Sequence, residues 1–344
     1  MISIMNKPSV SIIVPVYNVA PYVEDSIRSV MRQTYDGKME CIVVDDCGTD
    51  DSMSIVEKVI EDYNGPITFK ILHHTHNRGL SAARNTGIDA STGDYLFFLD
   101  SDDELTDKGI EKLASVLHSE WYDIVVGNVE CYDIMSDKKK RIQNLEFNIE
   151  NDILLRSPEV IDAIIRWRNV TVWNRLFRAS FIKSSGLRFK EGMLHEDNLW
   201  SLQVACLASS LYLLNQFTYR YIRREGSITM PFNKGRKMDC LTVVIQEMDS
   251  FIEEKNISES MVFPAINKYF SEILQYHFSS RKDFIRIYKQ VRPFIRARLN
   301  VIVRTKGRFV QKYLSNFHYI LPICIAPYWQ YIIYYRLRTL IKQK

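Results

Sequence analysis

The sequence predicts an α/β fold with a doubly wound, mostly parallel sheet, followed by a helical and basic C-terminal region that associates with membranes. Three observations lead to this prediction. Short apolar runs alternate with helical repeats through residues 10–128, as in strands joined by helical crossovers. Acidic residues follow several of these runs. Residues 281–344 hold fifteen Lys or Arg and one acidic residue, whereas residues 1–280 carry a net charge of −10.

The first half of the chain contains the alternating elements. Each predicted strand is short and apolar, and each predicted helix repeats apolar residues every three or four positions, as Val23, Ile27 and Val30 do. The strands are expected at 10–16, 40–46, 67–73, 95–100 and 123–128. The helices are expected at 20–34, 51–63, 80–90 and 108–118.

The alternation stops after residue 130. We expect a hairpin or loop at 131–150, irregular chain at 182–197, and a strand at 211–222. Further helices are expected at 159–167 and 198–209, and from about residue 232 onward. At 344 residues the chain is long enough for about two domains, which we place at 1–230 and 231–344.

Composition excludes several classes of protein. A chain with 46% hydrophobic and 25% charged residues is neither disordered, collagen-like nor a disulfide scaffold. Its six cysteines form no C-x-x-C pair and have no zinc-site spacing. Several lie in apolar runs, as free thiols do in a reducing cytoplasm, and residues 1–9 contain no signal-peptide core. We therefore expect a cytosolic catalytic part.

Two carboxylates after the fourth predicted strand form the first candidate site. Asp100 and Asp102 are two residues apart, so both can turn toward a ligand at the strand end, where open α/β sheets bind their ligands. Oxygen ligands with open positions suit Mg²⁺ or Mn²⁺ bridging a diphosphate. The alternative is a helix N-cap formed by Asp102 or Asp103.

Three further motifs end or follow neighbouring elements. Pro15 and Tyr17 close the first strand and can frame a planar base, or form an ordinary turn. Asp45 closes the second strand and can accept a hydrogen bond from a base or ribose, or belong to a capped turn. Arg84, on the third helix, suits bidentate contacts to a phosphate, or lies on a surface helix.

Together these motifs resemble family 2 glycosyltransferases of the GT-A fold. Members commonly show P-x-Y-N, V-V-D-D-G-S-x-D, N-x-G-x-x-x-A-R-N-x-G and D-x-D-D in this order. The corresponding segments here are 15–18, 43–50, 77–87 and 100–103. The resemblance covers about residues 8–225. Cys47-Gly48 departs from it, because Gly-Ser is usual at that place.

The resemblance implies a nucleotide-sugar donor bound by the residues at the strand ends. Asp45 would bind the base, with uracil expected. Asp100 would hold ribose and metal, and Asp102 would be the more direct ligand of a divalent cation, Mn²⁺ or Mg²⁺. The residues framing the nucleotide would be Pro15, Tyr17 and Arg84.

The resemblance also assigns residues on the acceptor side. Asp197, in the His-Glu-Asp segment, would be the catalytic base, with Glu196 beside it as neighbour or acceptor ligand. The alternative is a pair of acids that complement a helix dipole. Trp173 would stack on the acceptor sugar, or belong to the core. Arg224 matches a segment that can close over the diphosphate, although Ile222 stands where an Arg is usual.

The implied activity is an inverting, metal-dependent transfer from a UDP-sugar to a saccharide or lipid-linked saccharide, in surface polysaccharide synthesis. One carboxylate base and in-line attack predict a single displacement. Two alternatives stay open: a sugar nucleotidyltransferase, which would release pyrophosphate, and a membrane-associated scaffold without turnover. His74 and His76 suggest a zinc site, but two histidines without a third ligand are more often loop residues.

The basic end of the chain suggests a membrane surface. Residues 281–312 interleave Lys and Arg with apolar residues, as basic amphipathic helices do on anionic membranes. Residues 313–335 contain no Lys, Arg, Asp or Glu and hold eight aromatics. We favour interfacial anchoring there over a packed helical subdomain or a membrane span. No nucleic-acid-binding module is found. From the basic segment and the reducing environment that the cysteines suggest, we expect a cytoplasmic enzyme on the inner face of the cell membrane.

Overall fold

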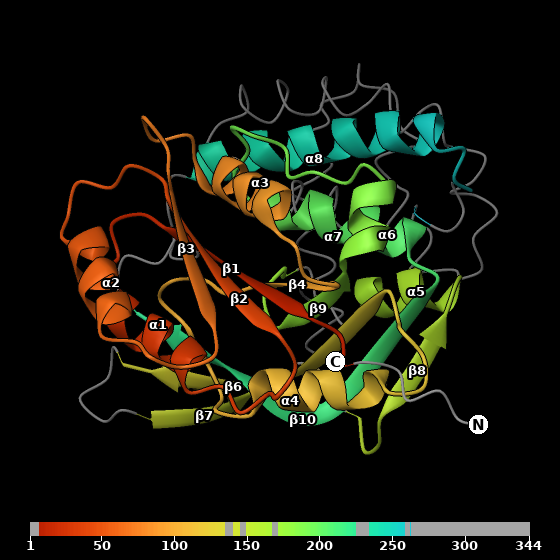
Figure 1. Ribbon diagram of the computed structural model, residues 1–344. Coiled ribbons are helices and arrows are strands. Elements are labelled where there is room, and N and C mark those ends of the chain that lie inside the picture. Colours follow the sequence, from red (N-terminus) through yellow and green to blue (C-terminus); the bar gives the residue numbers. More distant parts are fainter. Residues whose placement is uncertain are drawn as a thin grey trace. The chain divides into compact units, whose positions relative to one another are not determined.

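A computed structural model of the chain describes residues 7–134, 140–144, 149–166, 171–224, 234–258 and 262 (Figure 1). The chain divides into two compact units, Met1–Met230 and Pro231–Lys344, and each is described by itself. The first unit contains a ten-stranded sheet with helices packed against it. In the second unit the main described element is helix α8 (Lys234–Glu254).

The sheet has the strand order β3-β2-β1-β4-β9-β6-β10-β5, with β7 paired to β6 and β8 paired to β10. Its first part is parallel and consists of β1 (Val10–Val16), β2 (Met39–Asp45), β3 (Thr68–His73) and β4 (Tyr95–Phe98). The long strands β6 (Ile124–Asp133) and β10 (Ser210–Arg223) are also parallel to each other. Between β4 and β6 lies β9 (Arg175–Arg178), antiparallel to both. The predicted α/β fold with a mostly parallel central sheet is therefore confirmed.

Helices cover both faces of the parallel part, because the side chains of successive strand residues point to opposite faces. Cys41 and Val43 of β2 belong to the core that also includes α1 (Val23–Met31), α2 (Ser52–Glu61) and α4 (Gly109–Ala114). Ile42 and Val44 instead pack with Ala83 of α3 (Leu80–Ala90). Such strands are buried on both sides, which explains their unbroken apolar sequence.

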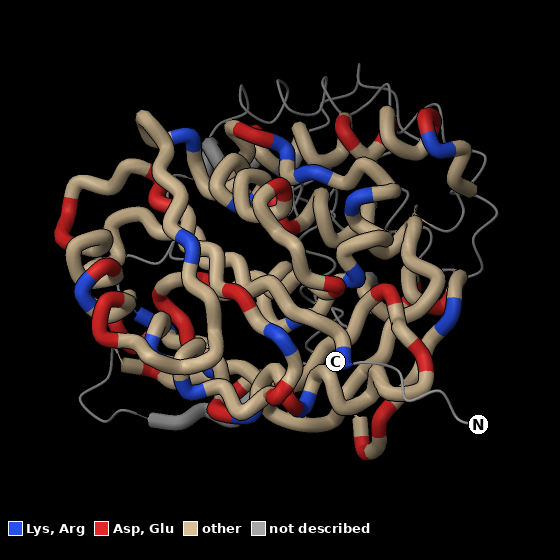
Figure 2. Tube along the Cα trace, viewed as in Figure 1, with Lys and Arg blue, Asp and Glu red and all other residues tan. Residues whose placement is uncertain are grey.

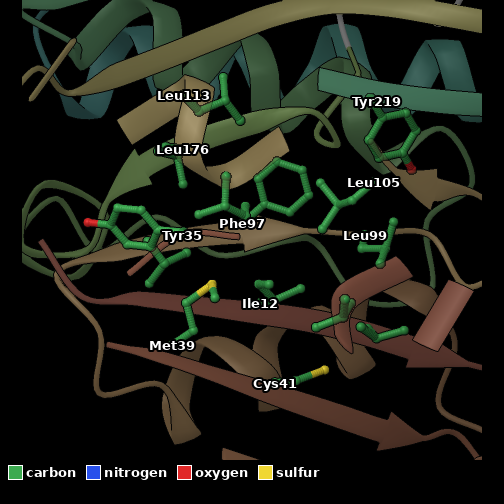
Figure 3. Close-up of a cluster of buried hydrophobic side chains, with 14 of the residues drawn as sticks. Ile12, Tyr35, Met39, Cys41, Phe97, Leu99, Leu105, Leu113, Leu176 and Tyr219 are labelled. Atoms are coloured by element: carbon green, nitrogen blue, oxygen red, sulfur yellow. The ribbon is translucent and has the colours of Figure 1, made fainter. Parts of the chain in front are cut away.

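One hydrophobic core extends from β1 across the sheet to β10 (Figure 3). Ile12, Phe97, Leu105 and Tyr219 are each 0% exposed. The rings of Phe97 and Tyr219 lie 6.4 Å apart, so β4 and β10 share one packed interior although β9 and β6 lie between them in the sheet. This packing fixes the end of β10 beside the loop that follows β4.

The second half of the first unit matches the sequence predictions in part. The predicted strand at 211–222 is β10, and the expected helix at 159–167 is α5 (Glu159–Arg166). Within the expected hairpin or loop at 131–150, the end of β6 pairs antiparallel with β7 (Lys140–Asn144), and residues 135–139 and 145–148 lie outside the described residues. The predicted helix at 198–209 is α7 (Glu196–Leu207). Four shorter elements were not predicted: β5 (Glu104–Leu105), β8 (Ile153–Arg156), β9 and α6 (Ala179–Ser184).

The basic segment 281–344 lies outside the described residues, so its proposed membrane contact stays a prediction. Acidic and basic positions are interspersed along the part of the chain that the structure describes (Figure 2). Within that part, no helix combines the length and the apolar character needed to cross a membrane.

Candidate active site

The parallel strands bring several of the predicted residues to one edge of the sheet. Val16 of β1 is in register with Asp45, the last residue of β2. Asp100 and Asp102 follow β4, which pairs with the other side of β1. Pro15 lies buried in β1, and Tyr17, just beyond it, is 46% exposed. The C-terminal ends of β1, β2 and β4 therefore form one edge of the sheet, the donor edge, which consists of Pro15, Tyr17, Asp45, Asp100 and Asp102.

The loops after β1 and β2 are tied to each other at this edge. Asn18 Oδ1 accepts a hydrogen bond of 2.8 Å from the Thr49 backbone N–H, and the Ala20 N–H donates to Asp50 at 2.9 Å. Cys47 has a positive φ of 58°, a conformation that glycine adopts more easily. Its backbone N–H donates to Asp45 Oδ1 at 2.9 Å. The Cys47 departure from the family pattern thus keeps the turn that orients Asp45.

The two aspartates at the end of β2 have different surroundings. Asp46 is buried and accepts hydrogen bonds of 2.8 Å from the backbone N–H groups of Arg78 and Gly79. His74 Nδ1 lies 2.7 Å from Asp46 and its Nε2 lies 2.9 Å from Thr86 Oγ1. Asp46 and His74 therefore stabilise the turn between β3 and α3, and we assign neither residue to ligand binding.

Asp45, in contrast, keeps a side chain that is 15% exposed. His73 Nδ1 lies 2.9 Å from Asp45 Oδ2, and this contact was missed by the sequence reasoning. The signal that could have indicated it is the position of His73 at the end of the predicted third strand, as Asp45 stands at the end of the second. Asp45 is thus held by a backbone N–H on one oxygen and by a histidine on the other.

The D-x-D-D segment divides into an open pair and a structural residue. Asp103 is buried and accepts hydrogen bonds of 2.8 Å from Tyr219 Oη and from the Ile222 backbone N–H. Asp102 is held by Arg224, whose Nη2 and Nε lie 2.7 and 2.8 Å from its Oδ2. Burial, and then the charge of Asp100, raises the pKa of Asp102. A cation beside this pair of carboxylates is therefore favourable, and Arg224 supplies one.

Arg84 lies between two acids that belong to different parts of the site. Its side chain is 2% exposed. Nη2 donates to Asp100 Oδ1 at 2.8 Å, and Nη1 donates to Glu196 Oε1 at 2.6 Å. Both terminal nitrogens thus contact carboxylates of this chain, whereas the resemblance placed Arg84 among the residues that frame the nucleotide.

Asp197 is the second residue of α7, directly after Glu196. Its Oδ1 accepts hydrogen bonds from the Asn198 backbone N–H at 2.9 Å and from Asn198 Nδ2 at 3.0 Å. Burial, and then the charge of Glu196, raises the pKa of Asp197 to about 7. A carboxylate with this pKa can accept a proton near neutral pH, as a general base must.

Trp173 precedes β9 and lies on the tyrosines of β10. Its ring stacks on Tyr219 with centroids 4.8 Å apart, and on Tyr221 at 5.7 Å. Tyr219 also donates its hydroxyl hydrogen bond to Asp103. The indole is therefore part of the layer that supports the D-x-D-D loop, and its contact with an acceptor sugar stays a prediction.

The donor set at Asp100 and Asp102 suits a hard divalent cation. Within the described part of the chain, no group of three or more His, Cys, Asp or Glu side chains is arranged to hold a metal. Mg²⁺ in phosphate-handling enzymes is commonly held by one or two carboxylates together with substrate phosphates. The two carboxylates and the raised pKa of Asp102 fit that kind of site.

Comparisons with known proteins show the family of the chain. Residues 11–182 match the family model described as glycosyl transferase family 2. The chain is 32% identical to the glycosyltransferase GlyA of Streptococcus pneumoniae serotype 4, over 64% of this chain and 31% of GlyA. It is also 32% identical to the uncharacterized glycosyltransferase EpsJ of Bacillus subtilis, over 64% of this chain and 63% of EpsJ. The chain thus spans less than two thirds of the length of either relative.

Solved structures share the fold. The crystal structure of Staphylococcus aureus TarS 1–349 in complex with UDP-GlcNAc superposes with a TM-score of 0.69, covering 90% of this chain and 86% of that one. Sequence identity in this comparison is 19%. A second crystal structure of TarS 1–349 gives a TM-score of 0.68. The likeness shows that the arrangement of strands and helices is common to both proteins.

Proposed function

The chain belongs to glycosyl transferase family 2 and is a glycosyltransferase, and from this premise we propose that it uses a UDP-sugar as its donor. The acceptor in this proposal is a saccharide or a lipid-linked saccharide of a surface polysaccharide. One observation supports the proposal most strongly. The donor edge and the candidate base are joined by side-chain contacts, from Asp100 through the buried Arg84 to Glu196, the neighbour of Asp197.

Known proteins support the choice of donor. TarS, named a poly(ribitol-phosphate) β-N-acetylglucosaminyltransferase, has been crystallised with UDP-GlcNAc and with UDP. In the proposed complex, Asp45 accepts a hydrogen bond from the uracil N3–H. Tyr17 and Pro15 lie beside it at the end of β1. Cytosine presents a lone pair at N3 where uracil presents an N–H. The Asp45 carboxylate repels such an acceptor, so cytosine is disfavoured.

The reaction we propose is a single displacement with inversion. The acceptor hydroxyl attacks the anomeric carbon and a new C–O bond forms. The bond from that carbon to the diphosphate oxygen breaks, and UDP leaves with the electron pair. Asp197 accepts the hydroxyl proton, which its pKa of about 7 permits.

A divalent cation would be held by Asp102, with Asp100 beside it. When bound, such an ion neutralises the charge that develops on the leaving diphosphate. Arg224 contacts Asp102 in this structure, and we propose that in the donor complex its guanidinium contacts the diphosphate. In the proposal, Trp173 and Glu196 lie on the acceptor side, as the family resemblance implies.

We further propose that the basic segment 281–344 keeps the enzyme on the inner face of the cell membrane.

A nucleotide thermal-shift panel tests the donor. UDP should raise the Tm of the full chain because it binds the native state only, and the increase should need Mn²⁺ and be lost in Asp102→Ala. A larger shift with GDP or CDP would contradict the uracil assignment. With an active donor and acceptor, release of UDP supports transfer of a sugar, whereas release of pyrophosphate would indicate a nucleotidyltransferase.

Cys47 gives a second, local readout of the same site. Its side chain is exposed, whereas Cys41 and Cys131 are buried, and its backbone N–H contacts Asp45. Bound UDP should therefore slow alkylation of Cys47 by a maleimide, as measured by mass spectrometry of the peptide. Alkylation that UDP leaves unchanged, in a protein whose Tm rises with UDP, would place the nucleotide away from Asp45.

A further inference from the structure

The segment 188–196 runs beside α3 and leads to the candidate base. Four side-chain contacts join the segment to α3 or to the turn before it. The four pairs are Arg188–Asp89, Phe189–Asn85, Glu191–Arg78 and Glu196–Arg84. Since Asp197 follows the segment directly, these contacts bear on where the base lies.

Two of the four pairs, Arg188–Asp89 and Glu191–Arg78, are ion pairs whose side chains are exposed. The side chains of Arg188 and Asp89 are 43% and 64% exposed, and those of Arg78 and Glu191 are 39% and 48% exposed. Ion pairs this exposed contribute little to stability. The two remaining contacts are those that can hold the segment.

Asn85 makes a reciprocal pair of hydrogen bonds with the backbone of Phe189. Nδ2 donates to the Phe189 carbonyl at 2.9 Å, and the Phe189 N–H donates to Oδ1 at 2.9 Å. The Phe189 ring in turn stacks on Trp200 of α7, with centroids 4.1 Å apart and an interplanar angle of 10°. Asn85 is thus connected through Phe189 to the helix whose start holds Asp197.

Arg84 makes the second buried contact, one position earlier on α3. It joins Glu196 to Asp100 of the donor edge, and its guanidinium carbon lies 5.3 Å from the centre of the Phe189 ring. The Arg84 side chain is 2% exposed and cannot lose these carboxylates cheaply, because a buried charge left unpaired is strongly destabilising. Among the described residues nothing accepts a hydrogen bond from Arg84 Nε, so a contact of this nitrogen with the donor is the rival interpretation.

We propose that Arg84 and Asn85 are positioning residues that fix the start of α7, and with it Asp197, against the donor edge. Glu196 then serves as the partner of Arg84 and not as a ligand of the acceptor sugar. The assignment of Asp197 as base rests on the proposed function, whereas the attachment of segment 188–196 to α3 does not. The two parts can be tested separately.

Asn85→Ala removes one contact without creating a buried charge. We expect faster amide hydrogen exchange across residues 189–200, an unchanged Kd for UDP, and a kcat lower by about 100-fold, the cost of a displaced catalytic group. Asp89→Asn is the matched control, since it breaks an exposed pair of the same segment and should change none of the three. Unchanged exchange in Asn85→Ala would overturn the proposal.

The Arg84–Glu196 pair is tested by a double-mutant cycle. Arg84→Met and Glu196→Gln should each lower kcat, Glu196→Gln at unchanged Kd for UDP, and the double variant should lose no more than the worse single variant, because the two residues act as a unit. Additive losses would mean that Glu196 acts elsewhere. A weaker Kd for UDP in Arg84→Met with unchanged exchange would assign Arg84 to the donor instead. If the wild-type chain bound no UDP, the proposed function would fail, and hydrogen exchange would still decide the attachment of the segment.

Discussion

Strand β2 shows how position decides the chemistry of a carboxylate. Glu40, near its start, is buried and accepts hydrogen bonds from Ser11, Lys70 and the Thr92 N–H, at 2.6, 2.6 and 2.7 Å. Asp45, at its end, has one backbone donor and one exposed histidine. The fully bonded acid stabilises the fold, whereas the open one is available to a ligand.

Glu40 should therefore make stability depend on pH. Burial alone would raise its pKa, but the hydrogen bonds from Lys70, Ser11 and Thr92 outweigh burial and lower the pKa to about 2. Because the folded-state pKa lies below the unfolded one, this stability is present above about pH 4.5 and is lost as the pH falls toward 2. Glu40→Gln should cost about 1–2 kcal/mol at pH 7, measured by urea unfolding. An equal cost at pH 3 would contradict the assignment.

Asp197 predicts the pH dependence of turnover. With a pKa near 7, the base is protonated at lower pH, so kcat/KM should rise about tenfold per unit up to about pH 7 and then level off. Asp197→Asn, similar in shape but without a basic oxygen, should lose activity while binding UDP normally. A profile that stays flat from pH 5 to 8, or activity in Asp197→Asn, would assign the proton transfer to another group.

At the scale of elements, α3 explains a motif whose role the sequence did not reveal. The segment Ala83-Arg84-Asn85-Thr86-Gly87 is recognisable from its letters, but its contacts lie about 100 residues away, at Phe189 and Glu196. A Cβ at Gly87 would lie 2.3 Å from Ile13 Cγ2, so glycine lets the helix approach β1. Spacing predicted the helix, and only the folded chain shows what each side of it holds.

The inserted strand β9 is the clearest limit of the sequence prediction. Four residues, 175–178, are too few for a periodic pattern, and their place between β4 and β6 depends on contacts distant in sequence. The long elements and the carboxylates at strand ends were predictable, because local periodicity and strand direction determine them. The contacts of Arg84 with Glu196, of Asp102 with Arg224 and of Trp173 with Tyr219 were not, since the two residues of each pair are more than 40 residues apart along the chain.

Asn174 anchors this inserted strand. It is 0% exposed, has a φ of 61°, donates to the Gly127 carbonyl at 2.7 Å and accepts from Thr218 Oγ1 at 2.6 Å. Asn174→Ala should cost about 2–4 kcal/mol, from unpaired buried groups and the left-handed backbone. Asn174→Gly removes the hydrogen bonds but tolerates the backbone, so it should cost less. Equal costs in thermal unfolding would show that backbone conformation contributes nothing.

The whole molecule combines a negatively charged catalytic part with a positively charged end. Residues 1–280 carry a net charge of −10 and residues 281–344 carry +14. An anionic membrane surface attracts the positively charged second part and repels the negatively charged first part. The charge pattern thus predicts that residues 281–344 are the part of the chain that contacts an anionic membrane.

Vesicle binding tests this at the level of the full chain. The protein should sediment with vesicles containing phosphatidylglycerol and not with phosphatidylcholine alone, because each basic residue near an anionic surface contributes about 1 kcal/mol. Replacing Arg292, Arg296 and Arg298 by Gln should weaken sedimentation and leave the UDP-dependent Tm shift unchanged. Added salt should weaken it too, since screening shortens the range of the attraction. Binding to both vesicle types alike would instead favour insertion of the uncharged segment 313–335 as the source of attachment.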